Sequence, residues 1–258
     1  MKILAIAAIL GLAAAQTYRG GELKTFQTFQ YGRFETRVKA AWAPGTVQSF
    51  FLYWDGPNWS EAQWNEIDVE IVPTSAPNGF SRNLIYGNGQ QKLQDQGYIQ
   101  TAGNLDDWHT YAVEWTPDRI TWIVDNQHKL TLDSSHESVR LMNKPQKLMM
   151  NIWSATWSPW GDGFDPSRFP FIIQYDYVKV WSYNYGNKGF DYMWTDDFDN
   201  FDYSRWQKSN NWSFDGNRVT FSWDNVFTMN GALNLRLDYW PHAKEVETQT
   251  EAAFLAPQ

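Results

Sequence analysis

The sequence contains no cysteine and no run of basic residues. Without cysteine there is neither a disulfide framework nor a zinc site built on thiolates. The formal net charge is −8, whereas binding to a phosphate backbone requires a basic patch. Nucleic acid is therefore excluded as a partner. Beyond the N-terminus no apolar segment is long enough to cross a bilayer, so no membrane partner is expected.

The N-terminus carries a single apolar run, Ile3–Ala15, after one lysine. The positive charge, the apolar centre and the small residues Ala13 and Ala15 are typical of a secretory signal. Residues 1–15 are therefore predicted to be a signal peptide, and the protein to be secreted into the extracellular or periplasmic space. A buried N-terminal strand or helix is the alternative interpretation.

Aromatic residues are abundant, with 16 Trp, 16 Phe and 13 Tyr. Tryptophan is large and seldom fully buried, so one core does not need so many. Aromatic faces pack well on the apolar faces of pyranose rings, and the surplus predicts a sugar-binding surface. About half of the rings are expected to belong to an aromatic core instead.

Short alternating segments separated by turn signals predict an all-β protein, a β-sandwich or jelly roll. Asp125-Asn126 is expected to form a two-residue hairpin turn, because both residues tolerate positive φ. The other strands are expected at residues 33–40, 64–72, 111–115, 120–124, 148–153, 171–181, 218–223 and 232–237.

One domain is predicted over residues 16–239. The Gly/Asn-rich connector at 184–189 is interpreted as a surface loop within that fold, because the stretch after it is too short for a second domain. Residues 240–258 lose the alternation and are expected to form a disordered tail.

The segment 64–72 carries the candidate chemistry. Strand side chains alternate, so Glu66, Asp68 and Glu70 share one face while the intervening Ile and Val residues face the core. Three carboxylates in a row are costly unless they serve a purpose. A wet acidic face is the alternative, and the adjacent Trp64 and the surplus aromatics favour a functional site.

The order long–short–long suits a pair of catalytic carboxyls. Residues i and i+4 of a strand lie roughly 13 Å apart at Cα, and retaining glycosidases need carboxyls about 5–5.5 Å apart. Glu66 and Glu70 can lean inward across the shorter Asp68 to close that gap. One glutamate then attacks the anomeric carbon and the other protonates the leaving oxygen, while the aspartate holds the proton distribution.

The motif resembles the active-site strand of family-16 glycoside hydrolases. The resemblance implies that Glu66 is the nucleophile and Glu70 the acid/base, and the motif without an inserted residue is typical of lichenases and xyloglucan transglycosylases. Further lichenase-like segments cover nearly all of residues 20–240 in the same order: 31–35, 45–47, 108–111, 114–117, 151–153 and 177–180.

The segment order suggests a circularly permuted lichenase. Residues 196–206 resemble a segment that opens the chain in most lichenases, yet here they follow the sheet strands. Residues 231–237 would ordinarily lead into a strand such as 21–25. The connector at 184–189 lies where other members have their two ends.

The resemblance also implies a jelly-roll β-sandwich of two antiparallel sheets with a concave substrate cleft, and contacts with a glucan there. The substrate-binding positions are Phe51, Tyr53, Trp64, Asn83, Asn151, Trp153, Trp160 and Trp206. Glu22 matches an acidic position near the cleft, with a surface salt bridge as the alternative. Met149, Asp55 and Ser81 depart from the pattern, since relatives carry Arg, Asn and Gln there.

A structural calcium ion is implied by the same resemblance, and no cofactor for catalysis. Its ligands would be the Asp176 carboxylate and the backbone carbonyls of Asp197 and Gly231. By strand parity Asp176 shares a face with Val178 and Val180, which predicts a buried carboxylate. A hydrogen-bonded aspartate without metal is the alternative.

Together these features predict a monomeric, secreted endo-β-glucanase. It would hydrolyse β-1,4 bonds adjacent to β-1,3 bonds in mixed-linkage β-glucan, with retention of configuration. The alternatives are a β-1,3-glucanase or xyloglucan-active hydrolase or transglycosylase of the same family, and a non-catalytic carbohydrate-binding sandwich.

Overall fold

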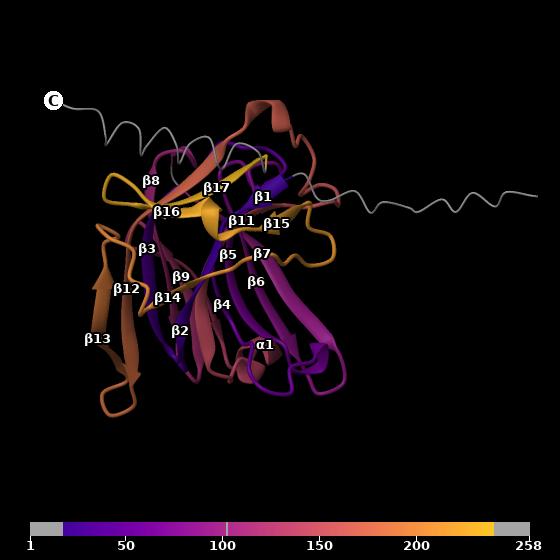
Figure 1. The fold of residues 1–258 in the computed structure, drawn as a ribbon. Helices are drawn as coiled ribbons and strands as arrows, with labels where there is room; N and C mark the ends of the chain where they lie inside the picture. The colour runs from indigo at the N-terminus through magenta and orange to yellow at the C-terminus, as the bar shows by residue number, and fades with distance from the viewer. Residues whose placement is uncertain (1–17, 102, 240–258) are drawn as a thin grey trace, which may run out of the picture.

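The computed structural model describes residues 18–101 and 103–239 as two β-sheets packed face to face (Figure 1). The predicted signal peptide and the predicted C-terminal tail lie outside the described residues. All strand pairs are antiparallel except β1 with β15, which are parallel. The observed architecture is the all-β two-sheet class that the alternating segments predict. None of the helices within the described ranges is long and apolar enough to cross a membrane.

The strands of the described chain divide between a ten-stranded and a seven-stranded sheet. In spatial order the first contains β10 (Gln127–Asp133), β9 (Arg119–Val124), β8 (Trp108–Trp115), β3 (Gly32–Lys39), β12 (Phe171–Asn184), β17 (Leu233–Tyr239), β1 (Tyr18–Gly20) and β15 (Val219–Phe221), with β13 (Gly189–Asp196) on β12 and β16 (Val226–Thr228) on β17. The second contains β14 (Trp206–Lys208), β2 (Glu22–Phe29), β11 (Gln146–Ser154), β4 (Thr46–Tyr53), β5 (Asn65–Ile71), β6 (Gly79–Gly87) and β7 (Lys92–Gln100). The helical turns are α1 (Glu137–Leu141), η1 (Glu61–Gln63), η2 (Pro166–Arg168) and η3 (Trp223–Asn225).

The hairpin between β9 and β10 forms where the sequence predicts it. Asp125 and Asn126 have φ of 49° and 60° and separate the two strands, which is the left-handed geometry that a two-residue hairpin turn requires. The connector at 184–189 likewise forms the turn between β12 and β13, and Asn184 pairs with Gly189. It is therefore a loop within one fold.

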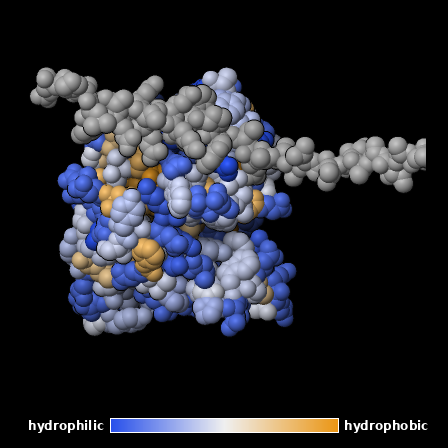
Figure 2. All heavy atoms as spheres, in the orientation of Figure 1, coloured by the Kyte–Doolittle hydropathy of each residue, from blue (hydrophilic) through white to orange (hydrophobic). Residues whose placement is uncertain are grey.

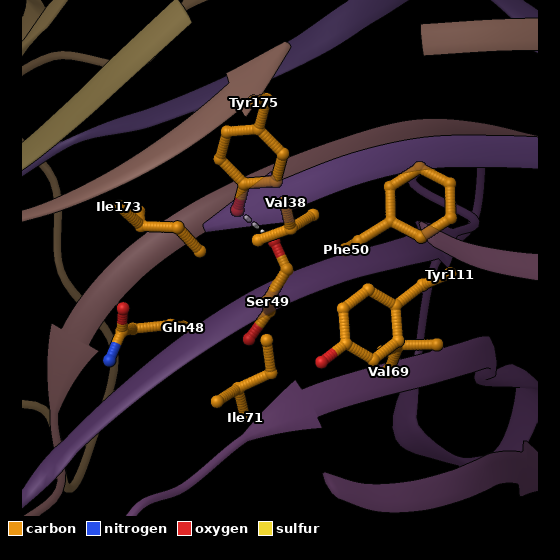
Figure 3. A pocket seen from close by; sticks show the side chains of 9 residues that line it. All are labelled: Val38, Gln48, Ser49, Phe50, Val69, Ile71, Tyr111, Ile173 and Tyr175. Atoms are coloured by element: carbon orange, nitrogen blue, oxygen red, sulfur yellow. Dashed lines mark hydrogen bonds between the residues drawn. The ribbon is translucent and has the colours of Figure 1, made fainter. Parts of the chain in front are cut away.

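The core lies between the two sheets. Figure 3 looks into it: Val38, Ile173 and Tyr175 come from the ten-stranded sheet and meet side chains of β4 and β5. The Tyr175 hydroxyl donates to the backbone oxygen of Ser49 at 2.8 Å. The Trp122 indole donates to the backbone oxygen of Asp68 at 3.1 Å, so the ten-stranded sheet supports β5 from behind.

Some strands differ from the prediction. The segment 218–223 contains only the three residues of β15 before η3 begins. The strands that were not predicted are β1, β4, β6, β7, β13, β14 and β16. In β7 most of the alternate residues are only half-buried, and in β13 only Asp196 is buried. Neither strand therefore carries the apolar signal of a core strand. The face seen in Figure 2 is mostly hydrophilic, with hydrophobic residues in small separate areas.

Candidate active site

The three carboxylates lie on β5, inside the seven-stranded sheet between β4 and β6. Ile67, Val69 and Ile71 are at most 2% exposed and belong to the core cluster. Their burial agrees with the predicted alternation and leaves Glu66, Asp68 and Glu70 on the opposite face of the sheet, called here the carboxylate face.

The middle carboxylate is the most enclosed. Asp68 is 2% exposed, whereas Glu66 and Glu70 are half-buried. The Trp64 indole donates to Glu66 Oε2 at 2.5 Å. Asp68 Oδ2 and Glu70 Oε2 are buried without a hydrogen-bond partner among the described residues. An unpartnered buried carboxylate is expensive, so the site favours retention of protons on this row.

Burial is the first cause of the raised pKa values of all three carboxyls, and the charge of Glu66 comes second for Asp68 and Glu70. Burial and then the charge of Glu66 raise the pKa of Glu70 to about 8. Burial raises the pKa of Glu66 to about 7, although hydrogen bonds from Trp64 and Asp68 oppose it. Burial, followed by the charges of Glu66 and Glu70, raises the pKa of Asp68 well above its ordinary value. Burial therefore keeps protons on all three carboxyls to a higher pH than an exposed carboxyl would.

Residues directly across the sheet from the carboxylates share their face. Phe51 on β4 and Asn83 on β6 lie opposite Asp68, and Tyr53 lies opposite Glu66. Asn151 on β11 lies opposite Ser49, which itself pairs with Glu70. The Oδ1 atoms of Asn83 and Asn151 are buried without a partner in the described chain, so both can accept hydrogen bonds from a ligand.

Aromatic rings lie beyond both ends of the carboxylate row. At the Glu66 end Trp64 contacts Trp59 and Tyr53, with ring centroids 5.2 and 5.7 Å apart. At the other end Trp157 bridges Trp153 and Trp160, at 5.6 and 6.1 Å. Trp59 and Trp157 are each 43% exposed, which leaves a ring open to solvent at each end.

Trp206 does not reach the carboxylate face. It is 1% exposed, and its indole donates to Asp196 at 2.8 Å in the core. Its neighbour Gln207 pairs with Lys24, which pairs in turn with Met149, so Gln207 takes the carboxylate face and alternation turns Trp206 inward. The Trp206 ring therefore lies away from the carboxylate face, and its contact with a glucan stays a prediction.

Comparison with known proteins identifies the family. The family model described as glycosyl hydrolases family 16 matches residues 5–179. The chain belongs to this family. A beta-glucanase of Fibrobacter succinogenes is 37% identical over 239 residues, which cover 90% of this chain and 67% of that protein. A beta-glucanase of Bacillus subtilis is 34% identical over 161 residues, 62% of each protein.

The fold agrees with that of a solved family member. The structure of the Bacillus licheniformis beta-glucanase superposes with a TM-score of 0.53 at 28% identity, covering 63% of this chain and 71% of that chain. The chain thus spans roughly two thirds of the relatives it matches. The likeness is consistent with the two-sheet sandwich of family-16 enzymes.

Glu22 is part of this family-16 site rather than a surface ion pair. It is 2% exposed and accepts hydrogen bonds from Ser209 at 2.7 Å and from Asn151 at 3.1 Å. Burial raises its pKa to about 7, and hydrogen bonds from these residues and from Trp212 oppose the rise. Glu22 therefore orients Asn151. Ser209 and Trp212 were missed, because they are distant in sequence and no motif marks them.

Asp55, Ser81 and Met149 differ from the family pattern. Asp55 and Ser81 are hydrogen-bonded to neighbouring side chains, and Met149 is buried. Asp55 accepts from Lys24 at 3.0 Å and from Lys147 at 2.8 Å. Ser81 accepts from Gln96 at 3.0 Å. Met149 is 5% exposed and takes the carboxylate face beside Phe51. The two lysines hold Asp55 as a carboxylate, and they lower its pKa against the opposing effect of burial.

The predicted burial of Asp176 is wrong. A bulge in β12 places Asp176 and Tyr177 together between the buried Tyr175 and Val178, which shifts the alternation by one residue. The Asp176 carboxylate is 36% exposed and accepts a hydrogen bond from Arg37 at 2.8 Å.

The donor chemistry nevertheless fits calcium, which prefers carboxylate and carbonyl oxygens. Val178 pairs with Asp196 and Tyr175 with Leu233, so Asp197 and Gly231 lie just beyond the strand ends that flank Asp176. Within the described ranges no three His, Asp or Glu side chains form a metal-binding group. An ion here would depend on backbone carbonyls and would share the carboxylate with Arg37.

Proposed function

We propose that this chain is an endo-β-glucanase that cleaves β-1,4 bonds next to β-1,3 bonds in mixed-linkage β-glucan, with retention of configuration. The observation that carries the proposal is the row Glu66–Asp68–Glu70 on one face of β5, with pKa values raised by burial. The similarity to beta-glucanases of Fibrobacter succinogenes and Bacillus subtilis supports the substrate class.

The proposed reaction has two displacements. Ionised Glu66 attacks the anomeric carbon while Glu70 gives its proton to the leaving glycosidic oxygen, so that one C–O bond forms as another breaks. Glu70, now ionised, takes a proton from water, and the resulting nucleophile breaks the Glu66 ester. Asp68 hydrogen-bonds to Glu66 and helps it to leave as a carboxylate.

The raised pKa of Glu70 supports its role. A general acid must be protonated at the pH of the reaction, and burial, followed by the charge of Glu66, raises the pKa of Glu70 to about 8. A purely carbohydrate-binding sandwich gains nothing from three enclosed carboxylates. The flanking rings of Trp59, Trp64, Trp153, Trp157 and Trp160 would hold sugar units on both sides of the scissile bond.

Circular permutation and secretion are part of the same proposal. Tyr18 pairs with Tyr239, so the two ends of the described domain are adjacent, and adjacent ends make permutation inexpensive. Matches to the Bacillus subtilis protein cover 62% of this chain, whereas those to the Fibrobacter succinogenes protein cover 90%. This difference in coverage supports a segment order in this chain that differs from the order in the Bacillus subtilis protein. Secretion rests on the signal-like residues 1–15.

Product analysis tests the linkage preference. Digestion of barley β-glucan is expected to release mainly tri- and tetrasaccharides, because cleavage occurs only at β-1,4 bonds that follow a β-1,3-linked unit. Chromatography of the digest and reducing-sugar assays on barley glucan, laminarin, xyloglucan and carboxymethylcellulose measure this. Faster hydrolysis of laminarin or xyloglucan would assign the chain to one of the alternative family-16 activities.

Thermal melting tests the calcium site. Saturation at a hundred times Kd stabilises by about 2.7 kcal/mol, so EDTA is expected to lower the Tm by roughly 5–11 °C while kcat at room temperature is nearly unchanged. Asp176→Ala should abolish the calcium dependence. Asp197→Ala is the matched control, because it keeps the backbone carbonyl. Identical melting curves with calcium and with EDTA would show that there is no such site.

A further inference from the structure

A second candidate binding region lies at the edge of the sandwich, between β14 and the η3–β16 segment. It is a surface hollow of about 520 Å³. Its lining residues come from three short stretches of the chain: Phe26, Tyr203, Trp206, Gln207, Lys208, Trp223, Asp224, Val226 and Phe227.

Three aromatic residues of the hollow are unusually open to solvent. Phe26 is 55% exposed, Tyr203 72% and Trp223 56%. Lys208 Nζ lies 5.8 Å from the centre of the Tyr203 ring, and Asp224 carries the opposite charge, so the lining has no net charge. A group of large aromatic rings that are exposed together marks a binding site more often than a surface without a ligand.

Gln207 belongs both to the lining of the hollow and to the carboxylate face. Register partners link Asp68 to Phe51, Phe51 to Met149, Met149 to Lys24, and Lys24 to Gln207. These five side chains form one row across five neighbouring strands. Adjacent strands are about 4.8 Å apart, so four strand steps place Gln207 roughly 19 Å from Asp68. Gln207 is also one of the residues that line the hollow.

From this geometry we infer that the hollow binds a segment of the same β-glucan chain whose scissile bond lies at Glu66 and Glu70. A polysaccharide lying across the strands along this row arrives at Gln207 and then at the rings of Tyr203 and Trp223. Aromatic faces with adjacent amide and charged groups suit an uncharged sugar chain, which presents apolar ring faces and hydroxyls. The inference rests on the proposed function for the identity of the polymer.

The binding test uses an inactive background. Glu66→Gln protein is run in native gels that contain barley β-glucan, laminarin, xyloglucan or no polymer. Trp223→Ala and Tyr203→Ala are each expected to weaken retention by barley glucan roughly fivefold, which corresponds to about 1 kcal/mol. Tyr185→Ala is the matched control, because Tyr185 is 67% exposed on the β12–β13 turn outside the hollow. It should leave retention unchanged.

A kinetic measurement distinguishes the hollow from the catalytic row. In active protein, Trp223→Ala should raise KM for the polymer and leave kcat/KM for an aryl trisaccharide unchanged, because so short a substrate does not reach the hollow. Equal retention of variant and parent in the gels would overturn the inference. An equal fall of kcat/KM for the polymer and for the trisaccharide would also overturn it. A third outcome that would overturn the inference is a dimer in size-exclusion chromatography that Trp223→Ala converts to a monomer. The hollow would then be an interface between two copies of the chain.

Failure of the proposed function gives a different pattern. If the parent enzyme hydrolyses none of barley glucan, laminarin, xyloglucan and carboxymethylcellulose, the glucanase assignment is wrong, whatever the gels show. Retention by xyloglucan or laminarin alone, lost in Trp223→Ala, would keep the hollow as a sugar site and overturn its assignment to mixed-linkage glucan.

Discussion

Glu66→Ala is expected to lower kcat by several orders of magnitude, because the first displacement loses its nucleophile. Azide is small enough to enter the vacated space and attack from the same side as the missing carboxylate. Turnover should then return, and the product should be an α-glycosyl azide. An aryl β-glucoside with a good leaving group and NMR of the isolated azide measure both effects.

Glu70→Ala should behave in the complementary way. Loss of the general acid is expected to reduce kcat by roughly 10²–10⁴-fold on polymer. The glycosyl ester on Glu66 still forms from an activated substrate, and azide then attacks it from the opposite side, which gives a β-glycosyl azide. Azide needs no general base, so this rescue does not require Glu70.

Controls make the assignment specific. Glu61→Ala removes a glutamate that is 66% exposed and paired only with Lys92 among the described partners, and it should change neither rate nor product. Interchanged azide products would reverse the roles of Glu66 and Glu70. Undiminished activity in both alanine variants would remove the carboxylate row as the catalytic site.

The dependence of kcat/KM on pH is expected to be bell-shaped. The acidic limb reports ionisation of Glu66 and the basic limb reports loss of the proton from Glu70, whose pKa burial raises to about 8. Glu70→Gln, assayed on a substrate whose leaving group needs no proton, should lose the basic limb or have it displaced. A wild-type profile that is flat from acid to alkaline pH would contradict this assignment.

The same raised pKa values predict a stability effect with a definite sign. Folding raises the pKa of Glu70 above its ordinary 4.5, so the folded state binds more protons than the unfolded state. The stability from this group is fully present below about pH 4.5 and is lost as the pH rises through about 8. Glu70→Gln should therefore melt above the wild type at pH 9, and the difference should disappear at pH 4. An equal difference at both pH values would exclude the linkage.

Local patterns explain which features could be predicted from the sequence. The alternation in 64–72 correctly places Ile67 and Val69 in the core, and Asp125-Asn126 correctly marks a hairpin, because each depends on neighbouring residues alone. The bulge beside Asp176 depends on the registers of β12 with β3, and nothing in the local sequence marks it. The parity argument failed there for that reason.

Among the site residues, too, the features that the sequence did not predict depend on contacts between distant segments. Trp206 turns inward because β14 pairs with β2 in one particular register, which a resemblance between motifs does not reveal. Glu22 meets Ser209 across 187 positions of sequence, so their hydrogen bond could not be read from spacing. The order of causes for Glu70, with burial ahead of neighbouring charge, likewise required the packed sheet.

The position of β17 sets the order in which the molecule can assemble. This last strand of the described chain lies between β12 and β1, and the strand partners of β1 are β15 and β17. During synthesis β1 therefore has no strand partner until Val219–Phe221 has left the ribosome. One side of Phe171–Tyr175 stays unpaired until Leu233–Tyr239 has followed. Pairing over such long separations in sequence is slow. The ten-stranded sheet can thus close only after β17, the last described strand in the sequence, has been synthesised.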